Sequence, residues 1–293
     1  TTTSVALWLM LMNWRPARST AAALTLLTLG SFAVIQGLKL QQLTLLVSGL
    51  IALSAALLSR GYLFLAGVLM AFVTIKPQLA IPIAGWFLIW ALSNWKSRSR
   101  YVAGFGVTSV LFLAASRWIL PGWIARFRDG IVAYRSYTGG GGSVLDMLIT
   151  PALGRPLAVL ILLIIAFLCW RSRKASQLQP EFAWTTAIVL TATVVVIPMM
   201  APYNHVLLLP GILILVRQLP RLWRSSLVSR VLVIASTAII AWPWVGATGL
   251  PTSSAFASPH QLQQWWALPF YSTRFIPLGV LALQLISSSK VEK

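Results

Sequence analysis

The sequence ALGRPLAVLILLIIAFLCW, residues 152–170, contains no charged side chain after Arg155. An α-helix of this length is about 29 Å long, which matches the roughly 30 Å hydrocarbon core of a bilayer. A helix without a polar face needs lipid or protein on every side. We therefore expect this stretch to cross a membrane.

Comparable apolar runs recur along the chain, separated by polar residues, Gly or Pro. The chain is 58% hydrophobic and 9% charged, whereas a soluble domain carries about 25% charged residues. The expected fold is an all-α polytopic membrane protein, with residues 1–293 in a single transmembrane domain. The runs that we predict as helices are 19–37, 42–58, 62–75, 79–92, 101–119, 152–170, 183–201, 206–216, 228–246 and 272–288.

The net charge is +19, from 23 Lys and Arg against 4 acidic residues. These basic residues are spread between apolar runs and form no continuous face, so we expect the lipid bilayer and not nucleic acid as a partner. The single cysteine, Cys169, excludes an internal disulfide. No metal-ligand spacing and no nucleotide-binding or serine-elbow motif occurs, so we expect no metal and no cofactor.

Two apolar stretches are interrupted by polar residues beside a proline. Residues 62–92 contain Lys-Pro-Gln at 76–78, and residues 183–216 contain Pro-Tyr-Asn-His at 202–205. Each stretch is either one kinked helix or two limbs that turn at the polar residues. The distribution of Lys and Arg does not decide between these arrangements. We expect two limbs, because a single span needs only about 20 residues.

With two limbs at each break, polar side chains gather on the membrane side opposite to most basic loops. Lys76 is costly in a bilayer unless it has a function, and an ammonium group can bind phosphate. Alternatively, Lys76 reaches the interface from a helix end. His205 is a candidate base or phosphate-orienting group, or else a histidine facing interfacial water. The candidate sugar-binding residues on this side are Gln41, Gln42, Gln78, Tyr203 and Asn204.

The loops supply further candidates. Residues 121–135 predict an amphipathic helix in the membrane interface, in which Arg126 and Arg135 are candidate phosphate ligands. Asp129 is either a catalytic base or an ion-pair partner of a neighbouring arginine. We interpret Asp146 as structural, because it follows a serine at capping-box spacing. We predict a loop at 247–271, with its histidine in solvent, and short cytoplasmic turns at 96–100 and 171–174.

Three stretches resemble motifs of one enzyme family. Residues 37–46, GLKLQQLTLL, look like the GQxNxLL helix start of glycosyltransferase family 87. Residues 60–79 are similar to the family's GxLxALAxxxKP element, and residues 201–210, APYNHVLLLP, look like its SPY segment. The family includes polyprenol-phosphate-mannose-dependent alpha-1,2-mannosyltransferases. The chain departs from the pattern at Gln41, where Gly is usual, and at Thr44, where Asn is usual.

The resemblance implies a GT-C fold, a multi-helix transmembrane bundle with broken helices. It also implies transfer of a hexose such as mannose from a polyprenyl-phosphate donor to an extracytoplasmic glycan or glycolipid acceptor. The active site would lie on the outer face of the cytoplasmic membrane. Lys76, with Arg126 or Arg135, would hold the donor phosphate. The family's usual acidic residue lies in a first outer loop, which would precede Thr1.

We interpret residues 5–12 as the tail of a helix, so the chain is expected to be a fragment without its first helices and first outer loop. Two other functions fit the same residues. A transporter or lipid flippase also builds its site at broken helices, here around Lys76 and His205. In a membrane scaffold, both residues would be structural.

Overall fold

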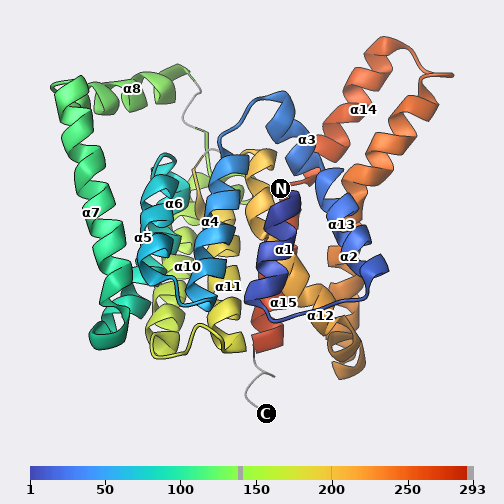
Figure 1. Ribbon diagram of the computed structural model, residues 1–293. Helices are drawn as coiled ribbons and strands as arrows, with labels where there is room; N and C mark the ends of the chain where they lie inside the picture. Colours follow the sequence, from blue (N-terminus) through green and yellow to red (C-terminus); the bar gives the residue numbers. More distant parts are fainter. Residues whose placement is uncertain (138–140, 199, 289–293) are drawn as a thin grey trace.

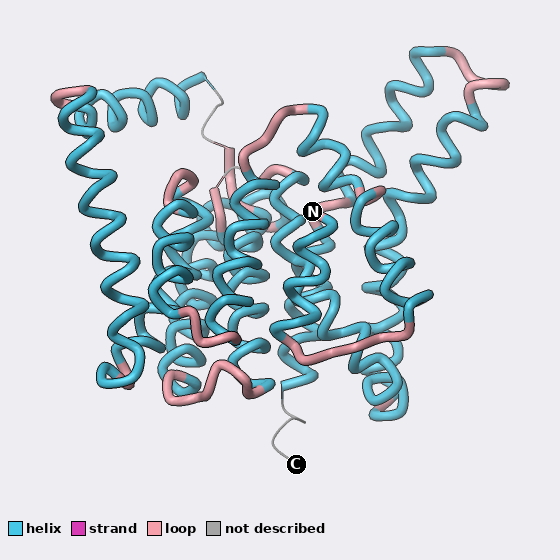
Figure 2. The backbone as a smooth tube through the Cα atoms, in the orientation of Figure 1, coloured by secondary structure: helices cyan, strands magenta, loops and turns pink. Residues whose placement is uncertain are grey.

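The computed structural model describes residues 1–137, 141–198 and 200–288, apart from the side chains of Arg135, Leu268, Pro269 and Ser288. Every regular element within these ranges is a helix, as the all-α prediction required (Figures 1 and 2). The helices are α1 (Thr2–Leu11), α2 (Arg18–Leu29), α3 (Phe32–Lys39), α4 (Thr44–Ser59), α5 (Leu63–Val73), α6 (Pro77–Leu92), α7 (Trp95–Ile119), α8 (Trp123–Tyr137), α9 (Val144–Leu148), α10 (Pro151–Ser172), α11 (Pro180–Val196), the 3-10 helix η1 (Pro202–Leu208), α12 (Leu209–Ser225), α13 (Leu227–Ser253), α14 (Pro259–Ser272) and α15 (Phe275–Ser288).

Five helical segments in the described part of the chain are long and apolar enough to cross a membrane. They are α7, α10, η1 with α12, α13, and α14 with α15. A sixth arises if α2 and α3, which meet at a bend of 45°, form one span. The chain therefore has the architecture of a polytopic membrane protein.

The helix α11 lies at the centre of the bundle. Every side chain from Phe182 to Val195 is buried. By contrast, α7 and α10 expose long apolar faces at the edge of the bundle. A helix that is apolar all round, such as α11, is suited to the centre of the bundle. The exposed apolar faces of α7 and α10 are suited to the edge, where they can contact lipid.

Both interrupted stretches form two limbs, as predicted. α5 ends at Val73 and α6 begins at Pro77, while α11 ends at Val196 and η1 begins at Pro202. Proline suits the first position of a helix, because the N–H that it lacks has no partner there. Both turns lie at the end of the bundle where α4 begins (Figure 1). We call this the Lys76 end.

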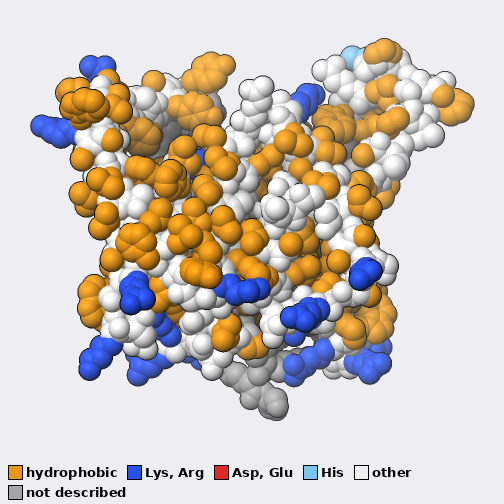
Figure 3. Space-filling model, in the orientation of Figure 1, with side chains coloured by type: hydrophobic (Ala, Val, Ile, Leu, Met, Phe, Trp, Pro, Cys, Tyr) orange, Lys and Arg blue, Asp and Glu red, His pale blue; other side chains and the backbone are white. Residues whose placement is uncertain are grey.

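The opposite end carries most of the basic side chains, and we call it the basic end. Figure 3 shows Lys and Arg along the lower edge of the molecule. By the positive-inside rule, we expect this end to face the cytoplasm. Its basic residues near the helix connections are Arg15, Arg18, Arg60, Lys96, Arg98, Arg100, Arg171, Arg173, Lys174, Arg217, Arg221, Arg224 and Arg230.

The helices α5 and α7 approach each other closely at two glycines. A Cβ atom at Gly67 would overlap the backbone of Tyr101 and Phe105, and one at Gly104 would overlap the carbonyl group of Phe64. Small residues at helix crossings let membrane helices pack backbone against backbone. The glycine at 104 therefore has a packing role.

We expect Gly104→Val to destabilise the protein by about 1–3 kcal/mol, because α5 and α7 must separate to admit the side chain. The measurement is the thermal unfolding midpoint in detergent. Gly106→Val is the matched control, since a Cβ at Gly106 meets nothing within 4 Å and the change in intrinsic helix propensity is the same. Equal shifts in the two variants would contradict a close crossing at Gly104.

Several predicted boundaries were wrong. Residues 247–271 are not a loop, because α13 continues to Ser253 and α14 begins at Pro259. Ser258 and Gln261 form a capping box before α14, a signal that the sequence contains. Residues 96–100 are not a turn either. They lie in the first turns of α7, and the chain reverses at 93–94 instead.

Two further segments differ from the prediction in detail. The run 19–37 is broken at Gly30 and Ser31, where the Ser31 hydroxyl caps α3 by accepting a hydrogen bond from the Val34 N–H. The amphipathic segment at 121–135 is the helix α8, which runs across the Lys76 end from the top of α7 (Figure 1).

Candidate functional site

Polar side chains from three separate segments meet at the Lys76 end. The Lys76 Nζ donates hydrogen bonds to Thr44 Oγ1 at 2.7 Å and to Gln42 Oε1 at 3.2 Å. The same ammonium lies 5.2 Å from the ring centroid of Tyr203, and Thr44 Oγ1 donates to Asn204 Oδ1 at 3.1 Å. We call these five residues the Lys76 cluster.

Each member of the cluster lies at or beside the start of a helix. Gln42 lies in the turn between α3 and α4, and Thr44 is the first residue of α4. Lys76 directly precedes Pro77, which starts α6, while Tyr203 and Asn204 follow a proline in η1. Proline disfavours helical geometry in the preceding residue, which favours a turn at these points, and the turns bring the polar side chains to one end.

The cluster is partly closed to solvent and contains no acidic residue. Thr44 and Asn204 are buried, while Lys76 and Tyr203 are half-buried. In the described part of the chain the one ion pair joins Arg128 to Asp129, so Lys76 has only neutral partners. Burial lowers the pKa of Lys76 in its turn between α5 and α6, and a bound anion would offset that cost.

His205 lies inside the bundle beside Asn204. It belongs to η1, which packs against α3, α4, α11, α12 and α15. Its side chain is buried, and its Nε2 atom has no hydrogen-bond partner among the described residues. A buried polar atom of this kind requires a water molecule or a ligand for satisfaction. The structure therefore places His205 next to the cluster but away from the interfacial water.

The remaining candidates lie outside the cluster. Gln41 and Gln78 are exposed beside it, and Gln41 has a φ of 50°, the left-handed region that favours glycine. On α8, Arg126 and Asp129 are both exposed. Asp129 Oδ1 accepts from the Arg128 Nε at 3.4 Å. The side chain of Arg135 lies outside the described residues.

The helix α8 ends close to the cluster. Tyr134, in its last turns, is near enough to Tyr203 for an electrostatic interaction. The chain then continues to Ser143 and Asp146, which form a complete capping box at α9. The structural interpretation of Asp146 is confirmed, although its second carboxylate oxygen, Oδ1, is buried without a hydrogen-bond partner among the described residues.

Thr44 is the cluster residue that we did not predict. It accepts the shortest hydrogen bond from Lys76 and links this lysine to Asn204. Its position two residues after Gln42, at the first turn of α4, was the available signal. Threonine in a membrane helix more often bonds to its own backbone, as Thr185, Thr191 and Thr193 do on α11, so the signal is weak.

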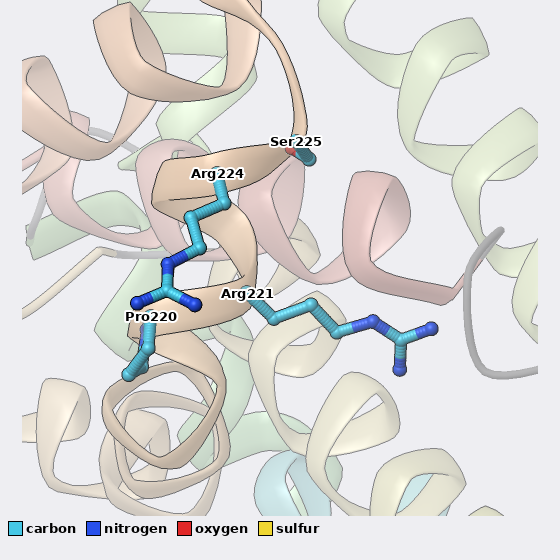
Figure 4. A pocket seen from close by; sticks show the side chains of 4 residues that line it. All are labelled: Pro220, Arg221, Arg224 and Ser225. Carbon is cyan, nitrogen blue, oxygen red and sulfur yellow. The ribbon is translucent and has the colours of Figure 1, made fainter.

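A second polar feature lies at the basic end. A hollow of about 510 Å³ is lined by Pro220, Arg221, Arg224 and Ser225 in the last turns of α12 (Figure 4). It is remote from the Lys76 cluster, because α12 runs from one end of the bundle to the other. No group of three His, Cys, Asp or Glu side chains within the described ranges is placed to hold a metal ion.

No family model, curated protein or solved structure shows detectable similarity to this chain. The likeness to glycosyltransferase family 87 therefore stays a prediction from three short motifs. These motifs contain all five residues of the Lys76 cluster, which the structure brings into contact.

Proposed function

We propose that this chain is an integral membrane glycosyltransferase that moves a hexose, such as mannose, from a polyprenyl-phosphate donor to an extracytoplasmic glycan or glycolipid. The observation that carries the proposal is the Lys76 ammonium, which is held by neutral groups and forms no ion pair with an acid of the described residues. This cation lies at the Lys76 end, opposite to the basic end. Because the positive-inside rule favours a cytoplasmic position for the basic end, the Lys76 end would lie on the outer face of the membrane.

The geometry of Lys76 suits a phosphate ligand. A lysine ammonium has three N–H donors, and two of them are used by Gln42 and Thr44. The third is available to a phosphate oxygen. Because its partners are neutral, they fix the position of the ammonium without cancelling its charge.

Glycosyl transfer from a phosphate donor is favoured by a fixed positive charge beside the leaving phosphate. In glycosyl transfer the bond from the sugar's anomeric carbon to the phosphate oxygen breaks, and its electron pair stays with the departing phosphate. A cation that is already in position stabilises this developing charge without reorganisation. Lys76 therefore takes the role of phosphate stabiliser, and no metal is required.

The other candidates take roles around this contact. Gln41 and Gln78, exposed beside Lys76, offer amide groups to sugar hydroxyls. His205, buried beside Asn204 with its Nε2 atom unpaired among the described residues, is the candidate to orient the phosphate or to assist proton transfer. Asp129 is the candidate base for the acceptor hydroxyl, and α8 controls entry of the lipid tail from the bilayer.

A transporter or lipid flippase is the second candidate. The observation that favours it is that Thr44 joins the two helix breaks, because it bonds both Lys76 and Asn204. Transporters build their sites at such breaks. The sequence contains no repeat that relates the two breaks, and it has few acids for proton coupling. These features favour the transferase.

The decisive assay places the full chain in membrane vesicles with radiolabelled polyprenyl-phosphate hexoses and a crude glycolipid acceptor. The transferase predicts label in a new product and release of polyprenyl phosphate. A flippase predicts movement of the intact donor between leaflets without a new product. Folded protein that forms no product with any of the donors overturns the proposal.

In the same assay we expect Thr44→Val to lower transfer about tenfold, the effect of losing one hydrogen bond to a charged group. Valine has nearly the same shape as threonine but cannot accept from Lys76 or donate to Asn204. Thr44→Ser keeps the hydroxyl and should retain most of the activity. Equal activity in the Val and Ser variants would show that the hydroxyl does not position Lys76.

A further inference from the structure

Arg274 is an isolated charge in the last part of the chain. In the sequence it is the one charged side chain between residues 231 and 289. It lies in the turn between α14 and α15. Because α15 runs from this turn to the basic end, the turn lies toward the Lys76 end (Figure 1). A charge in such an apolar region is costly, so it is usually kept for a partner or a function.

The backbone on both sides of Arg274 is held against the bundle. Thr273 and Ile276 are buried, and Thr273 Oγ1 donates to the Phe270 carbonyl at 2.7 Å. The Phe270 ring lies edge-on to that of Phe32 at the start of α3, with 6.3 Å between the centroids. These contacts limit how far the Arg274 side chain can reach into water.

The guanidinium of Arg274 is stacked but not neutralised. Its Cζ atom lies 4.8 Å from the centroid of the Tyr271 ring. Its Nε atom is buried without a hydrogen-bond partner among the described residues, where Arg274 forms no ion pair either. Part of the side chain remains accessible. Stacking uses the face of the planar group, whereas its N–H donors lie in the plane and can still bind an oxyanion.

Exposed aromatic rings flank this arginine. Tyr271 is 54% exposed and Phe275 is 45% exposed. Tyrosine and other aromatic side chains are typical of the depth at which lipid headgroups meet the hydrocarbon core. A free anion would use the guanidinium alone, whereas a lipid would also cover these rings. The surroundings of Arg274 therefore favour a lipid as the source of the anion.

We propose that Arg274 binds the phosphate of an anionic phospholipid in the leaflet at the Lys76 end, with the acyl chains of that lipid along Tyr271 and Phe275. Arginine is suited to this ligand, because its planar group donates two parallel hydrogen bonds to phosphate oxygens. The bound phosphate in turn offsets the cost of a charge at membrane depth. This inference does not depend on the proposed function, because it requires binding and no transfer.

The test uses the full chain in a mild detergent, stripped of lipid, with a phosphatidylglycerol probe that carries a photoreactive group near its headgroup. After illumination, mass spectrometry locates and quantifies the crosslinks. The wild type should be labelled at residues 271–275, and excess phosphatidylglycerol should compete. In Arg274→Gln the labelling of this segment should fall about tenfold, the effect of losing a hydrogen bond to a charged group. Arg274→Lys keeps the charge without the planar donors and should lie between the two.

The matched control is Arg117→Gln, which removes an exposed arginine from the last turn of α7 near the same end of the bundle. This variant should be labelled at 271–275 as strongly as the wild type. Equal losses in Arg117→Gln and Arg274→Gln would show a diffuse charge effect and overturn the site. Labelling that phosphatidylcholine removes as well as phosphatidylglycerol would show an apolar contact only. Displacement of the probe by equimolar inorganic phosphate would show a free-anion site, and either result rejects the lipid. Circular dichroism checks that the variants keep their helix content.

Discussion

Exchange of Lys76 for Met should lower sugar transfer by roughly a hundredfold or more, the usual loss when a fixed group that stabilises transition-state charge is removed. Methionine keeps the unbranched apolar stem and so preserves packing in the half-buried turn. It removes the ammonium that Gln42 and Thr44 hold in place. The measurement is the initial rate of product formation from a labelled polyprenyl-phosphate hexose.

Lys39→Met is the matched control for this experiment. Lys39 is an exposed lysine at the end of α3, near the same end of the bundle. The control variant should transfer sugar at close to the wild-type rate. If both variants lose activity equally, a general loss of surface charge explains the result and the phosphate role of Lys76 is wrong. Lys76→Arg, which keeps the charge but alters its position, should fall between the wild type and Lys76→Met.

Exchange of Arg98 for Ala should destabilise the protein by about 3 kcal/mol, a value typical of losing several hydrogen bonds from a buried charged group. Arg98 is only 7% exposed. Its Nη1 donates to the carbonyls of Trp90 at 2.8 Å and Arg173 at 3.0 Å, and its Nη2 donates to the Ala175 carbonyl at 3.0 Å. The guanidinium also stacks over the Trp90 ring, at 4.1 Å from the centroid.

This arginine therefore joins two connections at the basic end, the one between α6 and α7 and the one between α10 and α11. We expect the thermal unfolding midpoint in detergent to fall by roughly 5–10 °C in Arg98→Ala. Arg100→Ala removes the same side chain from an exposed position two residues later, and its midpoint should change little. A midpoint in Arg98→Ala equal to that of the control would show that the contacts of Arg98 contribute nothing to stability.

Local signals predicted most of the architecture. Apolar runs indicate membrane helices because the bilayer imposes both their length and their polarity. The prolines at 77 and 202 predicted where the chain turns, since proline restricts its own backbone and that of the preceding residue. Once both turns lie at one end, Lys76 and Tyr203 must come to the same side of the bundle, although they are far apart in the sequence.

The parts that were missed depend on side-chain choices or on weak local signals. Thr44 has no sequence feature that distinguishes it from threonines that bond their own helix, so its contact with Lys76 required the tertiary structure. The helix α14 was missed although Ser258 and Gln261 have capping-box spacing, because the surrounding Ser, Pro and Gln residues favoured a loop. Arg98 was predicted as part of a turn, whereas its burial depends on carbonyls from the distant 173–175 segment.

The link between Thr44 and Asn204 also has a consequence for biosynthesis. The two residues are 160 positions apart, so a ribosome adding 5–20 residues per second makes the second about 10–30 s after the first. During that interval the α5–α6 hairpin enters the bilayer with Lys76 at its tip, before Tyr203 and Asn204 exist. The cluster is thus completed only when the later hairpin arrives. A nascent chain stalled before residue 202 carries the lysine without two of the groups that surround it in the finished protein.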